Sequence, residues 1–140
     1  MHKWEDRALA TLVTPTNLQK MEFNVTTAEG PGRVTIVTGT MPVLIGALNS
    51  VGQKDSFKAL LDPTLTPGQF RKATATASLG AIAQWDGTAI TWTIEDAQAT
   101  LNDETGQVQL VIDVSVYAEG PGAAVQVRSL MFQVTTLAMV

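Results

Sequence analysis

Three carboxylates and one guanidinium form the most unusual group of charges that can be inferred from this sequence. The residues are Glu95, Asp96, Asp113 and Arg128, with Ser129 beside the arginine. Two of the segments that carry them break the alternation of apolar residues at the charged positions, as an inserted β-bulge residue would. Carboxylate oxygens are the ligands that Ca²⁺ and Mg²⁺ prefer. We therefore treat the three acids as a candidate cation site. In the simpler interpretation, Arg128 pairs with Asp113 and the other two acids face water.

Other chemistry is sparsely represented. The chain has one histidine, His2, and no cysteine, which excludes a histidine-dependent triad, a multi-histidine metal site and a thiolate. No serine stands in a Gly-x-Ser-x-Gly context, and no glycine pattern resembles a phosphate-binding loop. The sequence therefore predicts a protein that is not an enzyme and that holds no cofactor other than the candidate Ca²⁺ or Mg²⁺.

Three side chains are candidates for a contact or ligand patch. Trp85 stands beside an Asp-Gly turn, Tyr117 lies on the polar side of a predicted strand, and Met131 is a third large apolar residue expected near the surface. Aromatic residues and methionine are enriched at protein interfaces. The alternative is that these are isolated surface residues, which are common in soluble domains.

The elements that would position these residues are predicted strands. Runs at 71–85, 88–101, 107–118 and 123–137 are separated by short turn sequences rich in Gly, Asp, Asn and Pro. Short turns between neighbouring runs are typical of an antiparallel meander. We therefore expect long bulged strands in a β-sandwich or barrel, with residues 1–140 forming a single β domain.

The parity of the apolar residues predicts the register of this meander. Apolar residues change parity at Glu95-Asp96 and again at Arg128-Ser129. With a bulge at each place, the predicted cross-strand pairs are Ile94 with Val114, Ala97 with Ile112, Val114 with Val127, and Ile112 with Leu130. Both bulges would then lie opposite Asp113.

The N-terminal half is less regular. Segments 21–27 and 33–41 read as a hairpin around a Gly-Pro-Gly turn. Segments 43–51 and 55–61 read as one or two short helices between residues 43 and 62, because Asp55 could cap the second and Asp62-Pro63 could end it.

Composition narrows the class of protein. The chain is 45% hydrophobic and 16% charged, with a net charge of −4. No basic stripe is present, which argues against a nucleic-acid partner. No apolar stretch reaches the roughly 18 residues of a transmembrane helix. The first residues lack the apolar segment of a secretory signal, so we expect a cytoplasmic or virion-associated protein rather than a secreted one.

The function that these observations favour is structural. We expect a non-catalytic structural or interaction domain that acts as a homo-oligomer, such as a virion or surface assembly component. One alternative is a barrel or sandwich that holds a small apolar ligand beside the alanine-rich run at 73–83. The other is a cation-binding module at the bulged acids.

Overall fold

The computed structural model describes residues 10–85, with the backbone alone for Trp85, and residues 89–140. These residues form nine strands and no helix. None of the described residues therefore forms a helix that could cross a membrane. The strands are β1 (Thr11–Leu12), β2 (Thr16–Thr27), β3 (Gly30–Leu48), β4 (Gly52–Thr64), β5 (Phe70–Leu79), β6 (Ile82–Trp85), β7 (Ile90–Leu101), β8 (Gln107–Ala118) and β9 (Ala124–Met139).

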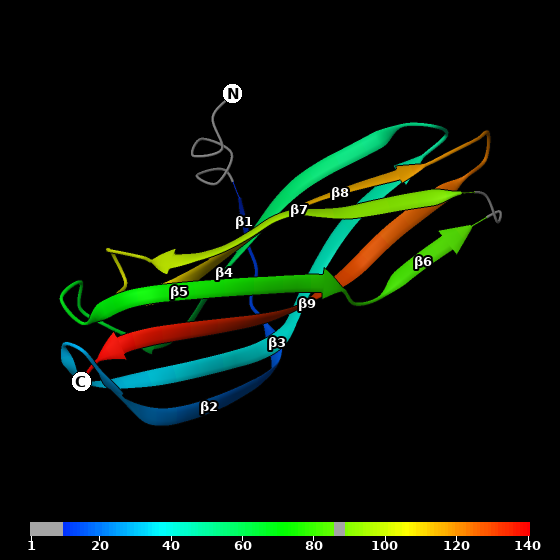
Figure 1. Ribbon diagram of the computed structural model, residues 1–140. Helices are drawn as coiled ribbons and strands as arrows, with labels where there is room; N and C mark the ends of the chain where they lie inside the picture. The colour runs from blue at the N-terminus through cyan, green and yellow to red at the C-terminus, as the bar shows by residue number, and fades with distance from the viewer. Residues whose placement is uncertain (1–9, 86–88) are drawn as a thin grey trace.

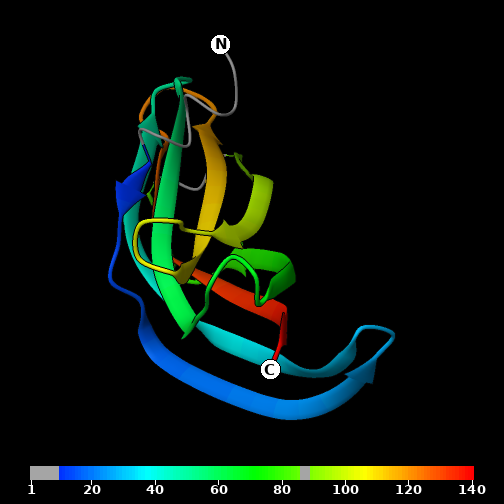
Figure 2. The ribbon, with the colours of Figure 1, turned by 90° about the vertical axis from the view of Figure 1, so that its left-hand side faces the viewer.

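The strands form two sheets that pack face to face (Figure 1). Sheet A has the order β1-β4-β8-β7, and only the short β1 pairs in parallel, with β4. Sheet B has the order β2-β3-β9-β5, and β6 pairs with β9 further along the edge that β5 begins. Figure 2 shows the β2–β3 hairpin reaching beyond the rest of the molecule. The architecture is a β-sandwich, one of the two alternatives that the alternating sequence pattern predicts.

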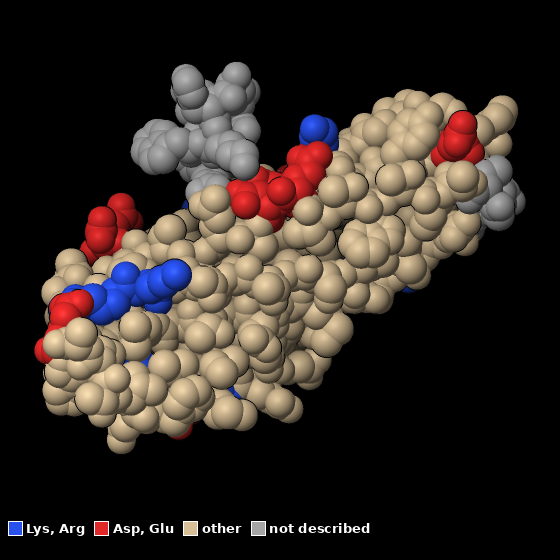
Figure 3. All heavy atoms as spheres, in the orientation of Figure 1, with Lys and Arg blue, Asp and Glu red and all other residues tan. Residues whose placement is uncertain are grey.

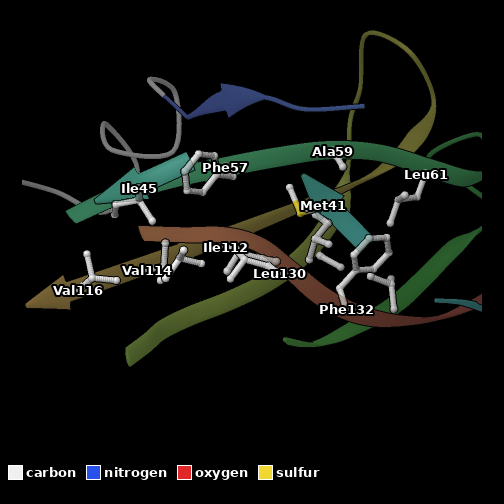
Figure 4. Packing of buried hydrophobic residues seen from close by; sticks show 14 of the residues in the cluster. Met41, Ile45, Phe57, Ala59, Leu61, Ile112, Val114, Val116, Leu130 and Phe132 are labelled. Carbon is white, nitrogen blue, oxygen red and sulfur yellow. The ribbon is translucent and has the colours of Figure 1, made fainter. Parts of the chain in front are cut away.

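The core lies between the sheets because every second residue of the central strands is apolar. In sheet A, Phe57 and Ala59 of β4 stand opposite Ile112 and Leu110 of β8, and all four are almost wholly buried. Sheet B contributes side chains from β3 and β9, which Figure 4 shows projecting into the same interior. The largest fully buried side chains are Met41, Leu110, Ile112, Leu130, Val108, Val114, Val127, Val134 and Thr136.

The predicted register of the hairpin between β7 and β8 is confirmed. Ile94 pairs with Val114 and Ala97 with Ile112, and the ladder shifts between Ile94 and Asp96, so that Glu95 is the extra residue. Asp113 faces Asp96 across this bulge. Parity was sufficient here because the two strands are neighbours in the sequence and one of their faces is buried.

The predicted hairpin between β8 and β9 is wrong. These strands belong to different sheets: β8 lies between β4 and β7, and β9 lies between β3 and the edge strands β5 and β6. Val114 and Ile112 therefore do not pair with Val127 and Leu130 but share the core with them. The change of parity in β9 is real, since Val127 and Leu130 are both buried, but it faces an irregularity in β3 between Pro42 and Ile45.

The connection from β8 to β9 crosses from sheet A to sheet B where this hairpin was expected. The turn from β3 to β4 also crosses between the sheets, and it is hydrogen-bonded to the β8–β9 connection. The β3–β4 turn contains Asn49 and Ser50, both with positive φ. The Asn49 side chain accepts a hydrogen bond from the Gly122 N–H at 2.9 Å, and the Ser50 hydroxyl accepts one from the Gly120 N–H at 2.8 Å. The two crossings thus hold each other at one end of the sandwich.

The short helices expected between residues 43 and 62 are wrong, because both segments are strands. Residues 43–48 continue β3 past its bulge, and Ile45 and Ala47 turn back into the core. Residues 55–61 lie in β4, where the pairing of Phe57 and Leu61 with β8 decides the conformation. The adjacent Leu60 and Leu61 resembled a helical apolar face, but Leu60 lies on the opposite side of the sheet from Leu61.

The alanine-rich run is an edge strand of sheet B that a strand of sheet A approaches closely. Ala73, Ala75 and Ala77 of β5 point inward and pack against the core. Their small side chains leave room for β7, which lies against β5. The pairing of this run with residues 88–101 expected from the meander is therefore wrong, because β5 and β6 both pair with β9. The turn expected at residues 86–88 lies outside the described residues.

Candidate interaction surfaces

The acidic residues singled out in the sequence meet in part, on the outer face of sheet A. Asp96 and Asp113 occupy directly opposite positions on β7 and β8, and Glu95 is the bulged residue beside them. Figure 3 shows acidic side chains gathered over β7 on this side of the molecule. Like charges directly opposite each other in a sheet destabilise it, so neighbouring groups must compensate for the pair.

Strand β4 supplies two of these neighbours. The Ser56 hydroxyl donates a hydrogen bond to Oδ1 of Asp113 at 2.6 Å. Nζ of Lys54 lies 3.3 Å from Oε1 of Glu95, although the lysine side chain is largely exposed. In residues 10–85 and 89–140, no group of three or more His, Asp or Glu side chains is placed to hold a metal ion. The cation site therefore remains a prediction of the sequence.

Arg128 and Ser129 do not join this group. They lie on β9 in the other sheet, where the Arg128 Nε donates to the side-chain oxygen of Gln126 at 3.1 Å. The Ser129 hydroxyl accepts a hydrogen bond from the Ala81 N–H at 2.7 Å, at the break between β5 and β6. The expected ion pair between Arg128 and Asp113 is thus replaced by the Ser56 hydrogen bond.

The three candidate contact residues do not form one patch. Tyr117 is exposed on the outer face of sheet A, where it borders a hollow of about 470 Å³ with Lys54 and Thr91. Met131 is exposed on the outer face of sheet B, on the other side of the sandwich. The side chain of Trp85 lies outside the described part of the chain. Any contact through Tyr117 is therefore separate from one through Met131.

An exposed apolar surface lies on the outer face of sheet B, around the β2–β3 hairpin. Met21 is 62% exposed and Phe23 is 44% exposed, and half-buried neighbours on β2, β3 and β9 lie beside them. The ladder places all these side chains on one face, because Phe23 pairs with Val34, which pairs with Leu137. We call this surface the outer apolar face; its residues are Met21, Phe23, Val25, Val34, Ile36 and Leu137.

A polar hollow adjoins the outer apolar face on the same side of sheet B. Its volume is about 590 Å³, and Met131 is the only large aliphatic side chain among the outward residues that line it. The other outward-facing residues are Asn17, Gln19, Thr38, Thr40, Thr76, Ser78 and Gln133. None of the described residues that line this hollow is charged, so they offer hydrogen bonds and shape but no electrostatic attraction for an ion.

No protein-family model, curated protein or solved structure matches this chain.

Sequence analysis missed the outer apolar face, although a signal for it was present. In segment 33–37, Val34 and Ile36 have one parity while Val37 has the other, so the strand is apolar on both sides. A strand of that kind is buried on both faces in most proteins. In segment 20–24, Met21 and Phe23 alternate with Lys20, Glu22 and Asn24, so that strand is apolar on one side only, the side of Val34 and Ile36.

Proposed function

We propose that this domain is a non-catalytic structural or interaction protein that assembles with other copies of itself. The observation that carries the proposal is the outer apolar face of sheet B. In a sandwich that works alone, the inner faces of the sheets form the core and the outer faces are polar. Here Met21 and Phe23 stand exposed on an outer face that remains apolar across three strands. Contiguous exposed apolar surface is typical of a protein–protein contact.

The arrangement of charge also supports an assembly role. The face of the molecule in Figure 3 carries few charged side chains, and broad uncharged stretches separate them. The interfaces of permanent assemblies have few charges at their centre. A component of a virion or of a surface layer would have this character.

The apolar-carrier alternative receives little support. The space beside the alanine-rich strand β5 is taken up by β7 and by buried side chains such as Phe132. The interior where a small apolar ligand would lie is occupied by the protein's own core. We therefore favour assembly over ligand transport.

The proposal is tested by the absolute mass of the protein in solution. Light scattering after size exclusion, at several concentrations, should give a defined multiple of the 14.9 kDa chain mass or a polymer that grows with concentration. A mass of one chain at every concentration would contradict the proposal.

A further inference from the structure

The free edge of β2 is the feature from which we infer how the copies meet. β2 is 12 residues long and is the terminal strand of sheet B, paired with β3 alone among the described residues. Figures 1 and 2 both show β2 along one margin of the molecule with no other element on its open side. A strand in this position presents a row of unpaired N–H and C=O groups, which can pair with another strand.

The other sheet edges are better protected than β2. Strand β7, at the margin of sheet A, carries the bulge at Glu95 and two adjacent acids. The far margin of sheet B is interrupted at Gly80, between β5 and β6, and its longer strand, β5, lies against β7 of sheet A. The free edge of β4 is partly covered by the short β1. Bulges, like charges and short strands are the usual protection against edge-to-edge pairing. β2 has an irregularity only near its start, between Thr16 and Gln19, and its two charges, Lys20 and Glu22, are of opposite sign.

The charges on β2 are self-complementary. In antiparallel pairing of two copies, a two-fold axis at Met21 places Lys20 of each copy opposite Glu22 of the other. An axis at Glu22 would instead place two carboxylates opposite each other, which destabilises a sheet. An axis at Phe23 would place Lys20 opposite Thr26, so that it would have no charged partner opposite it on the second copy. Within one copy, Nζ of Lys20 lies 3.6 Å from Oε1 of Glu22 and 3.6 Å from Oδ2 of Asp62, so a Glu22 of the second copy would add a further carboxylate to this lysine.

We propose that a second copy of this chain pairs antiparallel with the edge of β2, with the two-fold axis at Met21. The two copies of sheet B become one continuous sheet, and their outer apolar faces join across the axis. This inference rests on the proposed self-assembly and specifies which edge and register create it. Residues 19–23 of each copy form the regular centre of the new ladder, because the register of β2 with β3 has no irregularity in that stretch.

Single-cysteine variants test the register directly, because the chain has no cysteine of its own. Only the residue on a two-fold axis stands opposite its own copy. Opposite residues of an antiparallel pair have Cα atoms about 4.5–5.5 Å apart, which suits a disulfide. Under mild oxidation, we expect the Met21→Cys variant to form a linked dimer on non-reducing gels at least about tenfold faster than the Met131→Cys control. Met131 is 50% exposed on the same outer face but lies on the central strand β9.

A charge variant provides an independent readout. Met21→Lys places two ammonium groups opposite each other at the axis, so we expect the mass from light scattering to fall toward that of one chain. Met131→Lys, which introduces the same charge on β9, should keep the mass of the unmodified protein. Circular dichroism confirms that each variant keeps its strand content.

The outcomes separate this inference from the proposed function. A monomeric unmodified protein would overturn both. An oligomer in which Met21→Cys links no faster than Met131→Cys, and in which Met21→Lys keeps the full mass, would overturn the β2 edge alone. Faster linking by Phe23→Cys than by Met21→Cys would overturn the axis at Met21.

Discussion

Asp96 and Asp113 raise the question of what the protein gains from two carboxylates placed opposite each other on neighbouring strands. The hydrogen bond from Ser56 stabilises the Asp113 carboxylate without neutralising it. Lys54 lies beside Glu95 rather than between the two aspartates. The two carboxylates stand directly opposite each other, so replacing one of them by an amide removes the repulsion between them.

We predict that Asp113→Asn raises the free energy of unfolding by about 0.2–1 kcal/mol at low salt. The amide oxygen can still accept the Ser56 hydrogen bond, while the repulsion from Asp96 disappears. Chemical denaturation at low salt and at about 1 M salt measures the effect, which should shrink at high salt because screening already weakens the repulsion. Glu119→Gln, at an exposed residue directly after β8, is the control and should have no such effect. A loss of stability in Asp113→Asn would show that the protein depends on this carboxylate.

The same residues allow a test of the candidate cation site. If Glu95, Asp96 and Asp113 bound Ca²⁺ only in the folded state, saturating calcium at about a hundred times its dissociation constant would add roughly 2.7 kcal/mol to stability. Two opposed aspartates and one lysine-paired glutamate are a weak ligand set, so we expect equal melting temperatures in excess calcium and in chelator. A higher melting temperature in calcium than in chelator, lost in the Asp113→Asn variant, would establish the site.

At the scale of the elements, the junction between β5 and β6 shows how closely the backbone of sheet B is packed. The Gly80 N–H donates to the Ser129 carbonyl at 2.9 Å, and a Cβ at Gly80 would lie 2.9 Å from that same oxygen and against the Ser129 hydroxyl. At Gly68, by contrast, the nearest atom to a Cβ would be the Thr66 hydroxyl at 3.9 Å. The two glycines therefore allow the same substitution to be compared at a crowded position, Gly80, and at an open one, Gly68.

We predict that Gly80→Ala lowers the free energy of unfolding by about 1–3 kcal/mol, because the added methyl group forces the two strands apart. Gly68→Ala should be neutral or stabilising by up to about 1 kcal/mol, because alanine restricts the unfolded chain. Urea denaturation of both variants gives the comparison. Equal effects would mean that β5 and β6 do not approach β9 as closely as the structure has them.

Local elements of this fold could be predicted from the sequence where pairing partners are adjacent in the chain. The β7–β8 register followed from parity, since the bulge at Glu95 is the only change that keeps Ile94 and Ala97 on one face. The link from β8 to β9 could not be distinguished from a hairpin, because both strands alternate and the turn is short. Whether Val114 pairs with Val127 or packs beneath it depends on β3 and β4, which sequence analysis had partly assigned as helices.

In the candidate site, too, contacts within one hairpin could be predicted from the sequence, whereas contacts with segments distant in the chain could not. The juxtaposition of Asp96 and Asp113 was predictable because both residues belong to one hairpin. The contribution of Ser56 was not, since it comes from a segment that had been interpreted as a helix. Exposure of Met21 and Phe23 depends on which face of sheet B packs on sheet A, which is a property of the packed sheets rather than of β2.

At the scale of the whole molecule, sheet B is apolar on its inner face and over part of its outer face, but a sheet packs on the inner face only. The inner face packs on sheet A, and the outer apolar face around Met21 and Phe23 has no covering layer among the described residues. The free edge of β2 borders that same surface. The β2–β3 hairpin therefore offers a second copy both backbone hydrogen bonds, along the edge of β2, and apolar side-chain contacts, on the outer apolar face.

Association of this kind must link stability to protein concentration. If the native protein is a dimer and the unfolded chain is a monomer, mass action stabilises the folded form as concentration rises. For two chains of this size, we expect the melting temperature to increase by about 5 °C over a hundredfold range of concentration. Differential scanning calorimetry, or circular dichroism in cells of different path length, covers that range.

The variants at the two methionines decide whether the edge of β2 is responsible for this linkage. Met21→Lys should melt at the same temperature at every concentration, while Met131→Lys should keep the dependence of the unmodified protein. Both variants add one charge to the same outer face, so a difference between them reports the position of the contact rather than a general effect of charge. If both keep the dependence, the chains associate through a surface that neither methionine touches, and the hollow beside Tyr117 on sheet A becomes the next surface to substitute.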